Sequence, residues 1–232
     1  MAERSPRPVL SLHSVTVEYR TPAGAVTAVE DVSITVPGTG ITVLSGPSGS
    51  GKSTLLRILS LVDRPSFGTV ELDGKVVSGF SHRALRRLRR NRIALMVQNP
   101  VDNLLAQLTV GDNLRAAAQT AHRPPPGPQL LETLGLAGTG GWRIPALSGG
   151  QQQRLAFGCA LARGAGVLLA DEPTPQLDTA SADLVLQTLT ALAERSLPVV
   201  VASHDPRLVA LSHTLIRLRD GRVDTDQAGA VR

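Results

Sequence analysis

The fold of this chain is decided by residues 46–54, which read Gly46-Pro47-Ser48-Gly49-Ser50-Gly51-Lys52-Ser53-Thr54. The first eight fit the pattern G-x-x-x-x-G-K-[ST], the phosphate-binding P-loop. Residues 40–45 before the loop form a short apolar run with β-branched side chains, which predicts a buried strand. Residues 54–61 after it carry apolar side chains at helical spacing. This strand–loop–helix context favours a phosphate-binding loop over a Gly- and Ser-rich surface turn.

The residue types of the loop suit a nucleoside triphosphate with Mg²⁺. Its three glycines let the backbone bend tightly and aim successive N–H groups at one anion. The helix that begins at Lys52 adds its positive N-terminal end. Lys52 can then bridge the β- and γ-phosphates, and the Ser53 hydroxyl is placed to ligate Mg²⁺.

Length and composition indicate one globular unit of 232 residues with a substantial core and room for a subdomain. Hydrophobic residues make up 42% and charged residues 19%, as in an ordinary soluble protein. The formal charge of +5 is weak support for a nucleic-acid partner, because much of it comes from residues 83–92. Cys159 is the single cysteine, which excludes a disulfide framework within the chain and a cysteine-cluster metal site.

The sequence predicts neither a signal peptide nor a membrane-spanning helix. Residues 1–8 lack the apolar region of a signal peptide. No apolar run approaches the ~20 residues that a membrane-spanning helix needs. We therefore expect a cytoplasmic protein, held by another protein if it works at a membrane.

The first hundred residues predict an antiparallel sheet beside the P-loop and a basic helix. Strands are expected at 9–19 and up to 36, with a turn at 21–24, and a hairpin at 69–77 follows a turn at 65–68. Residues 82–92 suit a helix rich in arginine. A solvated face is the favoured interpretation of that helix, and a contact with anionic lipid or nucleic acid is the alternative. A buried strand at 93–97 then ends at Gln98.

A helical subdomain is expected to interrupt the α/β core. Residues 108–121 and 129–136 have helical patterns, separated by the Pro-rich break at 123–128 and followed by a Gly-rich connector at 138–141. We therefore assign residues 1–98 and 162–232 to the core with its antiparallel subdomain, and 99–161 to the helical subdomain.

Two further buried strands are predicted to end in chemically useful residues. Residues 167–171 read as a central parallel strand, and ligands bind beyond the carboxyl ends of such strands. Asp171 there can hold Mg²⁺, and Glu172 could polarise an attacking water, although an exposed corner is the alternative. His204 follows the strand at 198–203, where a contact with the γ-phosphate is favoured over a structural role.

A second anion cradle is predicted at Ser148-Gly149-Gly150-Gln151, which leads into a helix. It repeats the glycines, hydroxyl and helix N-terminus of the P-loop without a lysine. Because one P-loop already wraps its own phosphates, this cradle makes sense if it closes on the nucleotide of another copy. The alternative is a simple N-capping turn with Ser148 as the cap.

With these motifs in this order, residues 10–223 resemble the nucleotide-binding subunit of an ABC transporter. The resemblance implies a P-loop NTPase fold with a RecA-like core, an antiparallel β subdomain and the inserted helical subdomain. It implies a head-to-tail dimer, expected to be a homodimer, that sandwiches two Mg-ATP between each P-loop and the partner's signature. It further implies ATP hydrolysis coupled to an integral membrane permease, with the subunit on the inner face of the cell membrane and no nucleic-acid partner.

The resemblance also implies individual roles. Tyr19 would stack on adenine, residues 46–54 would form Walker A, and Gln98 would sense Mg²⁺ and the permease. Residues 147–151 match the LSGGQ signature, and Asp171 matches the Walker B acid. Glu172 would be the catalytic base, Asp178 would end the D-loop, and His204 would be the switch histidine.

In detail the sequence is most similar to the lipoprotein-release and macrolide-export type, over residues 28–33, 46–56, 104–110 and 147–154. Cys159, Pro175-Gln176 and Thr39 depart from common family residues, but none removes a group that the chemistry needs.

Two rival functions remain. One is a soluble ABC-type ATPase that acts on DNA or ribosomes, and the chain lacks the second ATPase unit, long coiled coil or zinc cysteines of such proteins. The other is a binding-only regulator, which the joint presence of Lys52, Asp171, Glu172 and His204 disfavours.

Overall fold

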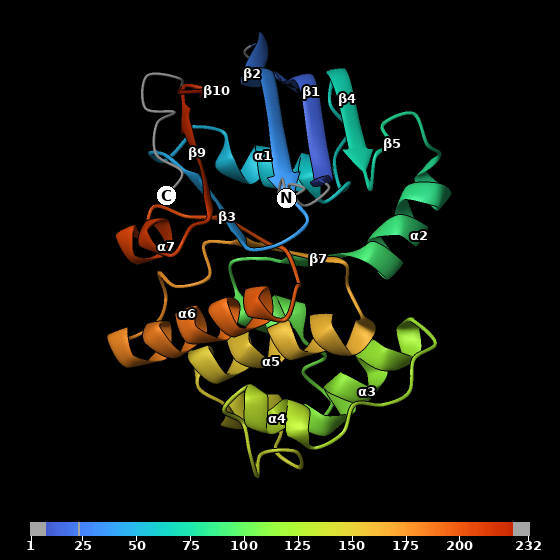
Figure 1. Cartoon of the computed structure of the whole chain (residues 1–232), viewed down its shortest axis with the longest axis vertical. Coiled ribbons are helices and arrows are strands. Elements are labelled where there is room, and N and C mark those ends of the chain that lie inside the picture. Colours follow the sequence, from blue (N-terminus) through green and yellow to red (C-terminus); the bar gives the residue numbers. More distant parts are fainter. Residues whose placement is uncertain (1–7, 23, 225–232) are drawn as a thin grey trace, which may run out of the picture.

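A computed structural model describes residues 8–22 and 24–224 in two sheets with helices around them (Figure 1). Residues 1–7 and Ala23, which belong to the predicted N-terminal region and turn, lie outside the described residues. The smaller sheet of the described part has four strands in the order β2-β1-β4-β5. They are β1 (Pro8–Thr21), β2 (Gly24–Pro37), β4 (Phe67–Leu72) and β5 (Lys75–Val76). All its neighbours run antiparallel, so the predicted antiparallel sheet is confirmed.

The larger sheet contains the strands that were predicted to be buried. Within the described residues its order is β10-β9-β3-β8-β7-β6. Its parallel strands are β3 (Ile41–Ser45), β6 (Ile93–Met96), β7 (Val167–Asp171), β8 (Val199–Ala202) and β9 (Thr214–Arg219), and β10 (Arg222–Val223) pairs antiparallel with β9. Because β3, β7 and β8 are neighbours, their carboxyl ends bring the P-loop, Glu172 and His204 to one edge.

Helix α1 (Lys52–Leu59) lies between the two sheets (Figure 1). Four of its side chains are almost fully buried and belong to one apolar cluster with residues of β1, β4, β7 and β8: Leu55, Leu56, Ile58 and Leu59. Burying such side chains contributes on the order of 2 kcal/mol each, which fixes the start of α1 against both sheets. The P-loop therefore has a rigid support on either side.

Helices α5 (Gly149–Arg163) and α6 (Thr179–Glu194) cover the other face of the large sheet (Figure 1). Phe157 of α5 and Val185 of α6 pack with β3 and β8 in a second cluster. Leu155 of α5 instead joins a third cluster with α3 (Val110–Thr120) and the region of α4 (Gln129–Thr133). One helix thus serves the core and the helical subdomain, and the predicted division at residues 161–162 falls inside it.

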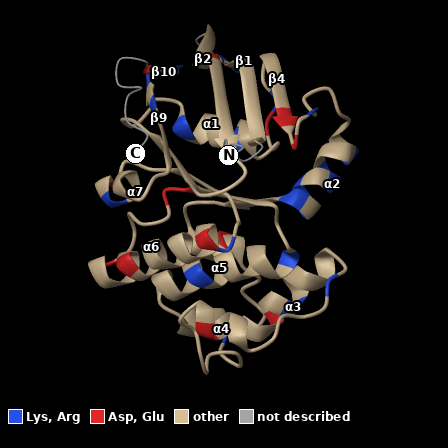
Figure 2. Ribbon diagram, viewed as in Figure 1, with Lys and Arg blue, Asp and Glu red and all other residues tan. Residues whose placement is uncertain are grey.

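The remaining elements are short apart from one basic helix. They are α2 (His82–Arg92), α7 (Pro206–Ala210) and the 3₁₀ turns η1 (Pro100–Asn103) and η2 (Ile144–Ala146). Figure 2 marks basic residues at the lower end of α2. In the described part of the chain, no helix combines the length and the apolar character needed to cross a membrane.

Several predicted bounds were wrong by a few residues. Phe67 and Gly68 already belong to β4: Phe67 pairs with Thr16 of β1, and Gly68 lies too close to the Ser14 carbonyl to carry a side chain. The helix expected at 129–136 ends at Thr133, and the following Gly135 adopts a positive φ of 63°. The helix expected at 108–121 begins at Val110, because Thr109 caps it by accepting a hydrogen bond from Asp112 N.

Cys159 lies half-buried on the helical side of α5, beside the third cluster. Desolvation raises the pKa of its thiol to about 12. The side chain is therefore an uncharged packing group at neutral pH.

Candidate functional site

The P-loop between β3 and α1 needs glycine at fixed places. Gly46 and Gly51 have positive φ values of 154° and 96°. A Cβ on Gly46 would meet the Leu218 carbonyl oxygen at 2.2 Å, and one on Gly51 would meet that of Ala28 at 2.7 Å. The loop can therefore hold its shape only with bare backbone at these positions.

Lys52 places its ammonium group inside this loop. The side chain is buried, and Nζ donates to the carbonyls of Gly46 at 2.8 Å and Pro47 at 2.9 Å. The hydroxyl of Ser50 is also buried in the loop and has no hydrogen-bond partner among the described residues. Buried polar groups are normally satisfied, so this hydroxyl fits a ligand group within the loop.

One pocket of about 560 Å³ gathers most of the predicted catalytic groups. The P-loop forms one wall through residues 47–49 and 51–54. Gln98 after β6, Glu172 after β7 and His204 after β8 line the same space, as does Pro175. The pocket thus brings together residues that are more than 150 positions apart in the sequence.

Ser53, which lines the pocket, is hydrogen-bonded to the Asp171 carboxylate, which lies just outside the pocket lining. Ser53 Oγ donates to Asp171 Oδ1 at 3.1 Å. Burial raises the pKa of Asp171, the neighbouring charge of Glu172 raises it further, and the Ser53 hydrogen bond acts in the opposite direction. Hard oxygen ligands of this kind, with phosphate oxygens and water, suit Mg²⁺. The glycine cradle, the unpartnered Ser50 hydroxyl and this pair together fit a Mg-nucleotide.

Glu172 is held in place from two sides. Its φ of 43° is in the left-handed region, and its side chain is only 16% exposed. Oε1 lies 2.9 Å from His204 Nδ1, and Oε2 accepts a hydrogen bond from Ser203 Oγ at 3.0 Å. A non-glycine residue at positive φ costs free energy, so this geometry is enforced by its surroundings.

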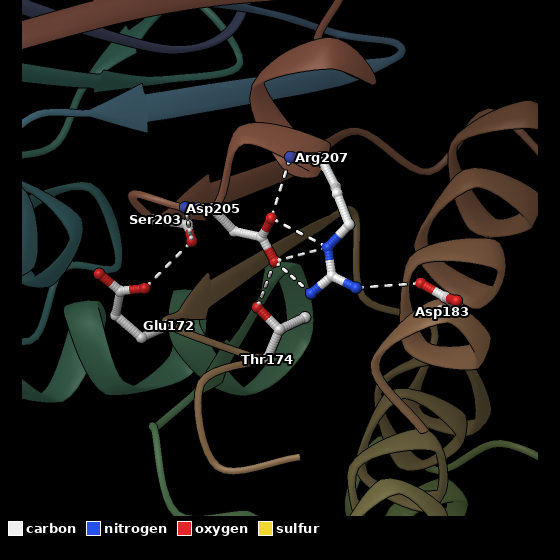
Figure 3. Close-up of polar contacts among 6 residues, drawn as sticks. All are labelled: Glu172, Thr174, Asp183, Ser203, Asp205 and Arg207. Atoms are coloured by element: carbon white, nitrogen blue, oxygen red, sulfur yellow. Dashed lines mark hydrogen bonds and ion pairs between the residues drawn. The ribbon is translucent and has the colours of Figure 1, made fainter. Parts of the chain in front are cut away.

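Ser203 connects Glu172 to a larger polar network, shown in Figure 3. Ser203 Oγ also accepts from Asp205 N at 3.1 Å, and Asp205 Oδ2 accepts from Thr174 Oγ1 at 3.1 Å. Arg207 Nη2 donates to Asp205 at 2.8 Å, and Nη1 reaches Asp183 of α6 at 3.0 Å. The hydrogen bond from Arg207 lowers the pKa of Asp205 most.

The sequence did not single out these partners of Glu172. Ser203 is fully buried at the end of β8, where an apolar run gives way to Ser-His-Asp. A hydroxyl directly before the predicted histidine was the signal that could have found it. Asp205 and Arg207 are local neighbours at the start of α7, but the fold alone brings Thr174 and Asp183 to them, so the spacing of those two carries no such signal.

The predicted second cradle lies at the surface and lines no part of this pocket. Ser148 caps α5: its Oγ accepts from Gln151 N at 3.3 Å, and Gln151 Oε1 accepts from Ser148 N at 2.9 Å. A Cβ on Gly150 would meet Ser181 Cβ at 2.8 Å, so the turn packs tightly against the start of α6. The capping role of Ser148 is present. A contact between this turn and a nucleotide would require a nucleotide that is held outside this pocket.

Tyr19 and Asp178 also lie outside the pocket lining, as do three residues described above: Gly46, Ser50 and Asp171. Tyr19 is 40% exposed on β1, opposite Val26 in the register. Asp178 caps α6 by accepting from Ser181 N at 2.9 Å, and this hydrogen bond lowers the pKa of the Asp178 carboxyl. Their predicted contacts with nucleotide stay predictions.

Comparison with known proteins gives one consistent family. The profile described as ABC transporter matches residues 29–175. A macrolide export ATP-binding/permease protein, MacB 1/2 of Paracoccus denitrificans, is 37% identical over 95% of this chain and 33% of its own length. MacB of Marinobacter nauticus is 35% identical, over 96% of this chain and 35% of its own length. The chain therefore spans about a third of the length of these relatives.

Solved structures resemble the whole chain. The ATP-binding cassette MJ0796, in a dimeric post-hydrolysis state bound to ADP and Pi, superposes with a TM-score of 0.83 at 30% identity. That match covers 96% of this chain and 99% of the cassette. A second dimeric structure of MJ0796 gives a TM-score of 0.80 at 31% identity, covering 93% of this chain and 96% of that one.

Proposed function

The chain belongs to the ABC transporter family, and from that membership we propose that it binds and hydrolyses Mg-ATP to drive a membrane permease. The observation that carries this proposal is the single pocket in which Lys52, Glu172 and His204 converge on the P-loop. The match to a cassette solved with ADP and Pi supports a nucleotide in that pocket.

Each group has a task that follows from its position. Lys52 would hold the β- and γ-phosphates, and the Ser53–Asp171 pair would hold Mg²⁺ with Gln98 nearby. Mg²⁺ neutralises charge on the phosphate oxygens. Glu172, fixed by Ser203 and His204, would orient the attacking water and accept its proton. His204 lines the same pocket and would contact the γ-phosphate.

A second subunit would complete the site. The turn at 148–151 has the form of an anion cradle, but it lies outside its own chain's pocket. Two solved cassettes that resemble this chain are dimeric. We therefore propose a head-to-tail homodimer in which residues 148–151 of each copy close on the nucleotide held by the other, with Tyr19 and Asp178 contributing as the family resemblance implies.

The permease is expected to be of the export or force-transmitting type. The relatives named above are macrolide export ATP-binding/permease proteins that are about three times as long as this chain. A permease linked to or bound by this chain would place it at the inner face of the cell membrane. The cargo would then depend on the membrane part.

Co-purification tests this function. The Glu172→Gln variant, tagged and captured from detergent-solubilised cells in the presence of ATP, should retain a permease with few membrane spans and a large outer domain. A many-spanning permease with a solute-binding protein would contradict the export type. Ribosomal or DNA-bound partners without a membrane protein would overturn the transporter function, and the parent protein captured without ATP is the control.

A further inference from the structure

Helix α2 carries two kinds of arginine. Arg89 and Arg92 are half-buried and have partners in the protein. Arg92 Nε and Nη2 donate to the Asp73 carboxylate at 3.0 and 2.8 Å, and Arg89 donates to the Leu61 carbonyl. These two side chains attach the helix to the rest of the fold.

The other four arginines form an exposed face: Arg83, Arg86, Arg87 and Arg90. Their spacing of i, i+3, i+4 and i+7 places them on one side of the helix. Within residues 8–22 and 24–224 none of the four forms an ion pair, and Arg90 has only a 3.4 Å hydrogen bond to Asn91. Like charges at these spacings destabilise a helix, so the four arginines do not serve to stabilise α2 itself.

The face continues onto neighbouring elements. A hollow of about 790 Å³ is lined by Ser81, Ala84 and the four arginines. An adjoining hollow of about 400 Å³ shares Arg87 and Arg90 and adds Arg123, after α3, and Arg163, at the end of α5. No aspartate or glutamate lines either hollow. Arg163 Nη2 donates to the Ile93 carbonyl, while its Nε is buried without a hydrogen-bond partner among the described residues.

This surface has the chemistry of a phosphate-binding face. Guanidinium groups bind phosphate oxygens through two parallel hydrogen bonds, which lysine cannot do. Of the 24 basic residues of the chain, all but Lys52 and Lys75 are arginines. Six of them lie on this one surface, so it attracts phosphates more strongly than any single pair would.

An exposed aromatic side chain at the start of α2 indicates which phosphates these are. Phe80, directly before the N-cap of α2, is 40% exposed. A basic helix face with an aromatic side chain beside it is typical of proteins that lie in the interface of a membrane. We propose that this arginine face docks on the anionic headgroups of a lipid bilayer, with Phe80 at the acyl boundary.

Vesicle flotation of the full chain tests the proposal without ATP, so its outcome is independent of the proposed ATPase function. The vesicles contain phosphatidylethanolamine with phosphatidylglycerol, or phosphatidylcholine alone. The triple variant Arg83→Gln, Arg86→Gln, Arg87→Gln is compared with a control that removes the same charge from exposed arginines elsewhere: Arg20→Gln, Arg115→Gln, Arg195→Gln. Both variants should keep the circular dichroism of the parent.

The parent and the control should float with the anionic vesicles and not with the neutral ones. The α2 variant should lose roughly 100-fold in partitioning, at about fivefold for each arginine. Added salt should weaken the binding of the parent, because exposed charges are screened.

Three results would overturn the proposal. The first is an equal loss in the control variant, which would mean that only net charge matters. The second is binding of the parent to duplex DNA with none to anionic vesicles. The third is an α2 variant that floats like the parent but no longer co-purifies with the permease, which would make the face a protein contact.

Discussion

The chain contains two Gly-rich turns that lead into helices, and they differ in what surrounds them. The P-loop at 46–53 is enclosed by the carboxyl ends of β7 and β8, with Lys52 inside it and a serine hydroxyl left unpartnered. The turn at 148–151 lies on the surface, and its Ser148 and Gln151 side chains satisfy each other. The P-loop has charged and polar side chains that can bind phosphate, and a pocket encloses it. The surface turn has only the backbone shape of an anion cradle, so it can contact a nucleotide only if another molecule supplies one.

The largest expected effect concerns the enclosed turn. Glu172→Gln should lower ATP turnover by about 10³-fold, because a positioned general base contributes between 10² and 10⁴. ATP binding should persist, since Lys52 and the loop are unchanged, and an ATP-bound dimer should accumulate. Phosphate release and size-exclusion chromatography with ATP measure the two effects. If the variant hydrolyses ATP like the parent, Glu172 is not the base.

The surface turn should respond differently. Ser148→Arg should reduce hydrolysis by about 10²-fold, the usual effect of losing a group that stabilises the transition state. It should leave ATP binding to the isolated monomer intact, because residue 148 does not line that chain's pocket. Titration with a fluorescent ATP analogue measures the binding. Loss of monomer binding would contradict the separation of the two turns.

A smaller effect is expected at Ser203, which holds the Glu172 side chain. Ser203→Ala removes the hydrogen bond to Glu172 Oε2 and should lower kcat by about tenfold with little change in KM. Thr190→Ala is the control, since it also removes a donating hydroxyl, here one that donates to the Leu186 carbonyl on α6, away from the pocket. A change in KM alone would show that Ser203 does not position the base.

The smallest effect concerns stability and pH. The folded-state pKa of Asp171 is raised, so the folded protein binds this proton more tightly than the unfolded chain does. Its contribution to the free energy of unfolding is therefore favourable below the unfolded pKa and is lost as pH rises through the folded pKa. Asp171→Asn should raise the stability of the nucleotide-free protein at neutral pH by less than about 1 kcal/mol, because solvent screens this partly exposed carboxyl, and have less effect in acid.

Urea unfolding at several pH values measures this difference. The same variant should lose Mg²⁺-dependent hydrolysis, since Asn is a weaker ligand than a carboxylate. A stability gain that grows as pH falls would have the wrong sign for a raised pKa.

The sequence predicted the enclosed site well because its parts are local. A β-branched run, three glycines and Lys52 specify a strand, a turn and a helix within twenty residues, and Asp171 and His204 each end an apolar strand. The contact between Glu172 and Ser203 depends on β7 and β8 being neighbours, which no local pattern contains. Helix α6 and strand β9 were not predicted, although Asp178 before 179–194 is a good N-cap signal.

The predicted boundary of the helical subdomain also depends on tertiary contacts that no local pattern contains. The prediction relied on a change in composition, but α5 is continuous and packs on the core with one set of side chains and on α3 with another. Packing of that kind leaves no Pro or Gly signal at residue 161. The bounds of the helical subdomain therefore remain a prediction.

The central claim is that the two turns meet across a dimer. Lys52→Ala disables the P-loop and Ser148→Arg disables the surface turn, so each variant alone should release phosphate much more slowly than the parent. In an equimolar mixture, a heterodimer contains one intact P-loop opposite one intact surface turn. The account predicts ATP-dependent dimers and a clear recovery of phosphate release in the mixture. A mixture that forms no such dimer and stays at the sum of the two separate rates would contradict it.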